Sequence, residues 1–153
     1  MRTRRYTLAL RLGLGCTLVL CGILSLTRAA DEKSETPPFS RKLDFVIGKE
    51  IPLDAVVGGV RFASINVESE KWKSGGYHLW LRIAAANPKH NHDRKVWAHV
   101  QLADKDGKLL ASDEAERGIE ADDDSVLKLS AHLDADPASV VATLLLELDA
   151  WED

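Results

Sequence analysis

Beyond residue 43, apolar residues alternate with polar ones far more often than they recur at helical spacing. Alternation at every second residue is the pattern of a strand with one buried face. The apolar runs are short and separated by Gly, Pro, Asp and Asn, which favours an all-β sandwich or barrel. The segments expected to be strands are 44–47, 59–68, 77–86, 95–103, 108–112, 126–133 and 140–150. Short helical turns are expected at 53–57 and 112–120.

Two of these expected strands, 77–86 and 95–103, carry aromatic and polar side chains opposite their aliphatic ones. If they pair as a hairpin around residues 87–94, their non-aliphatic sides form one surface. Tryptophan offers a flat apolar ring with one donor, which suits stacking on a sugar ring or docking a protein partner. The predicted binding face consists of Trp80, Arg82, Trp97, His99 and Gln101, with His78 beside them.

The same two tryptophans have a second interpretation. Trp80 and Trp97 are instead covered by residues 43–57 or by Trp151, and then form a small second core. The sequence leaves both interpretations open, because alternation identifies a side of the strand but not what packs on it.

The first thirty residues have the layout of a secretory signal peptide. Residues 1–11 are basic, residues 12–26 are an uncharged Leu-rich run, and small residues follow. The run is shorter than the about 20 apolar residues that a bilayer span needs. We therefore expect a signal helix at 1–29, a charged linker at 30–42 and a β-sandwich domain at 43–153, secreted or periplasmic. Membrane attachment is expected only if the signal segment is retained or lipidated.

Charge and cysteine content follow this division of the chain. The chain of 153 residues has 20 Lys and Arg against 24 Asp and Glu. Residues 1–29 hold five arginines, both cysteines and no acidic residue, so the rest carries 15 basic and 24 acidic side chains, a formal charge of −9. An acidic domain argues against a nucleic-acid partner. Without cysteine, it has neither a disulfide scaffold nor a cysteine nucleophile.

A His-x-His motif is the best metal candidate. His90, His92 and Asp93 lie in one loop, and imidazole suits zinc, copper or nickel. Zinc sites need three or four protein ligands, for which His78 and His99 are further candidates. The alternative is a solvated loop between strands. No cofactor is expected.

No catalytic residues are predicted, and the protein is not expected to be an enzyme. Ser64, Ser125 and Ser139 lack the Gly-x-Ser-x-Gly context of a hydrolase nucleophile. Carboxylates are abundant, but no pair is marked out as the two groups of a glycosidase.

Residues 77–133 resemble a small immunoglobulin-like domain of secreted bacterial proteins, similar to the FxLYD family. The likeness lies in Val100-Gln-Leu-Ala-Asp104 followed by Lys-Asp106-Gly107 and a hydrophobic strand, with Val100 and Ala103 in place of the family's Phe and Tyr. The resemblance implies an immunoglobulin-like antiparallel β-sandwich of about seven strands with an extracytoplasmic role and no common enzymatic activity.

Together these observations predict an exported, non-enzymatic protein with a binding or accessory role in the cell envelope. Its expected partner is an envelope protein or a carbohydrate. The alternative is a secreted protein that binds a divalent metal through His90 and His92.

Overall fold

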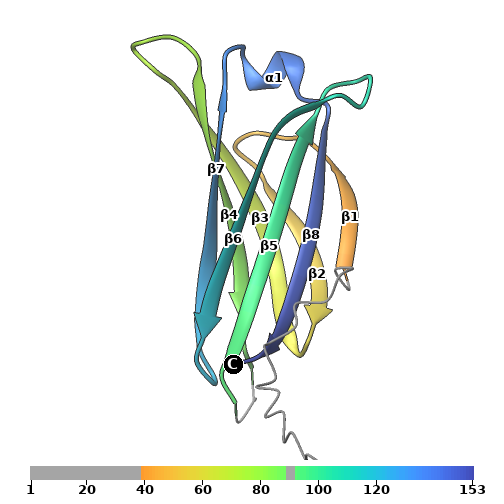
Figure 1. Cartoon of the computed structure of the whole chain (residues 1–153), viewed down its shortest axis with the longest axis vertical. Helices are drawn as coiled ribbons and strands as arrows, with labels where there is room; N and C mark the ends of the chain where they lie inside the picture. Colours follow the sequence, from red (N-terminus) through yellow and green to blue (C-terminus); the bar gives the residue numbers. More distant parts are fainter. Residues whose placement is uncertain (1–38, 89–91) are drawn as a thin grey trace, which may run out of the picture. The chain divides into compact units, whose positions relative to one another are not determined.

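The computed structural model describes residues 39–88 and 92–153, which form eight strands and one short helix (Figure 1). The strands are β1 (Phe39–Asp44), β2 (Glu50–Val57), β3 (Val60–Lys71), β4 (Tyr77–Ala86), β5 (Arg94–Ala103), β6 (Leu109–Ile119), β7 (Asp124–Leu133) and β8 (Thr143–Glu152). The helix α1 spans Pro137–Val140. No helix within these described ranges is long and apolar enough to cross a membrane. The predicted signal segment and residues 30–38 of the predicted linker lie outside them.

The strands form two antiparallel sheets of four. Sheet A has the order β1-β8-β5-β6, and sheet B has the order β2-β3-β4-β7. Figure 1 shows the two sheets lying one over the other. The predicted all-β sandwich is confirmed at this level.

The core lies between the sheets and is built from the alternation seen in the sequence. On β4, Leu79, Leu81 and Ile83 are at most 1% exposed, and on β8, Leu144 and Leu146 are fully buried. Fully burying one such side chain contributes about 1.5–3 kcal/mol. The side chains at the alternate positions, such as Trp80 and Arg82 on β4, face outward, so each sheet has an outer face on which function can be sought.

Two segments expected to form helical turns are strands. Residues 53–57 belong to β2, and most of 112–120 belongs to β6. Each has a neighbour that satisfies its backbone hydrogen bonds, β3 for β2 and β5 for β6, and this pairing outweighs weak local helix preference. The turn between β2 and β3 is Gly58-Gly59 with φ of 53° and 84°, the two positive values that a tight hairpin requires.

Polar side chains that face inward close both open sides of the sandwich. Asp113 on β6 accepts a hydrogen bond of 2.7 Å from the backbone N–H of Ser130 on β7. Arg41 on β1 donates to the carbonyl of Leu53 on β2 at 3.3 Å. β2 and β7 are the two edge strands of sheet B. Each of these bonds occupies a main-chain group on one edge strand that would otherwise have no partner strand.

Candidate functional site

The five residues of the predicted binding face lie on two different surfaces. β4, with Trp80 and Arg82, is in sheet B, whereas β5, with Trp97, His99 and Gln101, is in sheet A. The predicted hairpin between the two strands is therefore wrong. Their aliphatic sides face each other across the core, so their outer sides point in opposite directions.

On sheet A, the outer side of β5 is tied into polar contacts. The indole N–H of Trp97 donates to Glu114 at 3.2 Å, and His99 Nδ1 lies 2.8 Å from a Glu147 carboxylate oxygen. Trp97 is only 8% exposed. Little of its ring remains available for stacking on a ligand.

On sheet B, Trp80 belongs to a cluster of aromatic rings on the outer face. The indole of Trp72 stacks on His78, with ring centroids 5.2 Å apart and planes 19° apart. Trp72 also lies 5.1 Å from His132, and His78 lies 4.5 Å from Trp80. Trp72 is 43% exposed. We call Trp72, His78, Trp80 and His132 the aromatic cluster.

The fold brings the aromatic cluster together from three segments. His78 and His132 are directly opposite each other on β4 and β7, and Trp80 follows His78 by two residues on the same side of β4. Trp72 comes directly after β3, in the turn that leads to β4, and its backbone N–H bonds to the carbonyl of Gly76 at 3.1 Å. The turn therefore holds the exposed indole over the two histidines.

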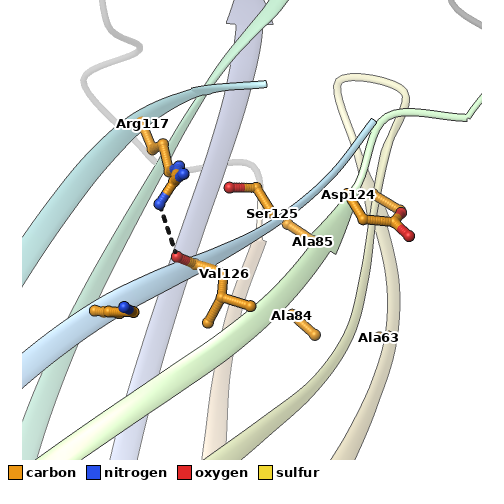
Figure 2. Close-up of a pocket in the computed structure, with 9 residues that line it drawn as sticks. Ala63, Ala84, Ala85, Arg117, Asp124, Ser125 and Val126 are labelled. Carbon is orange, nitrogen blue, oxygen red and sulfur yellow. Dashed lines mark hydrogen bonds between the residues drawn. The ribbon is translucent and has the colours of Figure 1, made fainter. Parts of the chain in front are cut away.

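A shallow groove continues from Trp80 along β4 and β7. Its first part, about 480 Å³, is lined by Trp80, Arg82, Val126 and Lys128 with neighbouring backbone. Its second part, about 500 Å³, has a floor of small side chains and shares Val126 and Lys128 with the first. Figure 2 shows this second part, with Arg117 reaching from β6 to the Val126 carbonyl at 3.5 Å. Its alanine floor consists of Ala63, Ala84, Ala85 and Ala86.

The predicted metal loop is only partly described. His90 lies outside the described residues. The carboxylate of Asp93 accepts a hydrogen bond of 3.0 Å from the backbone N–H of Ala121, which ties it to the loop after β6. Within residues 39–88 and 92–153, no group of three or more His, Cys, Asp or Glu side chains is arranged to hold a metal ion.

Trp72 and His132 were missed by sequence reasoning. Trp72 lies among charged and small residues between two expected strands. A tryptophan in such a polar turn is unusual, because large apolar side chains are usually buried, and this could have marked it as a candidate binding residue. His132 has no such signal: its place beside His78 depends on the pairing of β4 with β7, which brings together two residues 54 positions apart in the chain.

Comparison with known proteins adds no family to this description. No protein-family model matches the chain, and no curated protein has a similar sequence.

Proposed function

We propose that this protein is an exported, non-enzymatic β-sandwich that binds a carbohydrate chain on the outer face of sheet B. The observation that carries the proposal is the aromatic cluster, an open set of rings that continues directly into the groove. The signal-peptide layout of residues 1–29 supports export. The proposal includes an immunoglobulin-like fold, because immunoglobulin-like domains also consist of two packed antiparallel sheets.

The composition of this face favours a sugar over a protein partner. Its large exposed apolar side chains are Val56, Trp72 and Val126, at 70%, 43% and 38% exposure. They come from β2, from the turn after β3 and from β7, with polar side chains between them. The buried core of a protein interface is more apolar and less charged than this. A sugar needs one ring face for stacking and polar groups around it for its hydroxyls.

Polar groups of this kind lie beside the aromatic cluster. Arg82 Nη1 contacts Glu68 Oε1 at 3.1 Å, and the same carboxylate oxygen lies 3.5 Å from the Asn66 amide nitrogen. Ser130 and Lys128 follow along β7 on the same side of the sheet as His132. These side chains supply both donors and acceptors within two strands of the tryptophans.

The proposal is tested by titrating the protein with soluble oligosaccharides while following tryptophan fluorescence. The panel contains six-sugar oligomers of glucose, galactose, N-acetylglucosamine and galacturonate. We expect at least one to give a saturable change, and Trp72→Ala to weaken that binding about tenfold, the equivalent of about 1.4 kcal/mol for a lost stacking contact.

Trp151→Phe is the matched control, because Trp151 lies on β8 in the other sheet. It removes one indole from the signal and leaves the outer face of sheet B intact, so binding is expected to be unchanged. The proposal fails if none of the oligosaccharides binds, or if Trp72→Ala binds them as tightly as Trp151→Phe does.

A further inference from the structure

Two positive side chains face each other on the outer face of sheet B. Arg82 on β4 and Lys128 on β7 are directly opposite residues of adjacent antiparallel strands. Like charges in this position destabilise a sheet, by up to about 1 kcal/mol. Arg82 is partly neutralised by Glu68 at 3.1 Å. Among the described residues, the Lys128 ammonium forms no hydrogen bond or ion pair, so this cation is left without a counter-charge.

The unpaired cation lies in the groove beside the aromatic cluster. Lys128 lines both parts of the groove, and Trp80 and Arg82 line the first part with it. Arg117 lines the second part together with Lys128 and is the third positive group of the whole groove, and Asp124 is the lining carboxylate. The groove therefore carries more positive than negative charge, although the chain beyond residue 29 has a formal charge of −9.

We infer that the carbohydrate bound by sheet B is acidic, a chain whose sugars carry a carboxylate. This inference rests on the function proposed above and specifies its ligand. Arg82 lies two positions along β4 from Trp80, and Lys128 is directly across from Arg82 on β7. A uronic acid ring stacked at Trp80 can therefore extend its carboxylate toward both cations. A carboxylate bound there replaces the missing counter-charge through charge-assisted hydrogen bonds.

The local cations have to supply this selectivity themselves. The net charge of the domain repels anions at long range, so recognition of an acidic chain depends on groups within a few ångströms. Ammonium and guanidinium groups at the rim of an exposed groove make screened interactions, and binding is therefore expected to weaken as salt is added.

The test compares a six-sugar oligogalacturonate with its full methyl ester, which has the same rings without the charges. We expect the acid to bind at least tenfold more tightly than the ester at low salt, and to lose this advantage in 0.5 M NaCl. Lys128→Gln is expected to weaken binding of the acid about fivefold, the equivalent of about 1 kcal/mol for one exposed ion pair. Lys42→Gln, which removes the same charge from β1 in sheet A, is the control and is expected to leave binding unchanged.

The outcomes separate this inference from the proposed function. If acid and ester bind equally well and both need Trp72, the acidic ligand is refuted and the carbohydrate function stands. If neither acid nor ester binds while a neutral oligosaccharide of the panel does, the acidic ligand is again refuted and the carbohydrate function stands. If no oligosaccharide of the panel binds, the proposed function fails and this inference with it. If a six-residue glutamate peptide binds as tightly as oligogalacturonate and Trp72→Ala has no effect, the groove recognises acidic peptides and the inference is overturned.

Discussion

Replacing Gly58 by alanine tests how the two sheets are held together. Gly58 is in the turn between β2 and β3 of sheet B, at a φ of 53°. A Cβ added there lies 2.0 Å from the backbone carbonyl oxygen of Ala150, on β8 of sheet A. A carbon and an oxygen in a C–H···O contact are normally about 3.3 Å apart or more. To reach that distance, the turn and β8 have to separate by about 1.3 Å.

The expected loss of stability has two parts. The left-handed backbone of Gly58 costs an alanine about 1–2 kcal/mol. Forcing the turn away from β8 disturbs close packing, which typically costs a further 1–3 kcal/mol. Gly107→Ala is the matched control, because Gly107 has a φ of 81° and nothing within 4 Å of its added Cβ. It is expected to show only the first part.

Urea and thermal unfolding, followed by circular dichroism and tryptophan fluorescence, measure the difference. Gly58→Ala is expected to lower the free energy of unfolding by about 2–5 kcal/mol, and Gly107→Ala by about 1–2 kcal/mol. For a domain of this size, each kcal/mol corresponds to about 4 °C in Tm. The reasoning is refuted if the two variants are equally stable, because the close approach to Ala150 would then carry no energetic weight.

Three further variants test other parts of the structure. Asn87 is fully buried, and its Nδ2 donates to the carbonyls of His92 and Glu120, both at 3.2 Å. Because an aspartate carboxylate cannot donate, Asn87→Asp should lower the free energy of unfolding by about 2–3 kcal/mol in urea titrations. Unchanged stability would contradict these bonds. Asp113→Ala removes the acceptor for the Ser130 N–H and should cost about 1 kcal/mol and speed amide exchange at Ser130, whereas unaltered exchange would show that β6 does not protect this edge. Lys128→Glu relieves the like-charge pair with Arg82 and should stabilise the ligand-free protein by a few tenths of a kcal/mol while abolishing oligogalacturonate binding, and a destabilised variant would count against the pairing.

The proposed site illustrates how far its residues follow from the sequence. Alternation along 77–86 placed Trp80 and Arg82 on the side of β4 away from the core, and the structure agrees. The same reasoning identified Trp97, His99 and Gln101 as outward residues of β5. It could not assign β4 and β5 to different sheets, because a strand's alternation is the same whether the next strand pairs with it or crosses the core.

The wrong prediction of a helical turn at 112–120 has a related cause. In β6, Ala111 and Ala115 are four residues apart among charged side chains, which resembles one face of a helix. In the structure these alanines face inward, opposite Leu102 and Ala98 of β5. Asp113 also faces inward, where it can bond to β7, so a charged residue in the interior pattern hid the strand's period of two.

The sequence by itself determined that the chain folds as an all-β protein, which side of each central strand is buried, and how charge is divided between the first 29 residues and the rest. These properties depend on neighbours along the chain and on composition. Only the tertiary structure decided that Trp80 joins Trp72 and His132 rather than Trp97, and that Arg82 faces Lys128. Those contacts join residues from separate strands, and strand order is set by packing of the whole core, which no local pattern encodes.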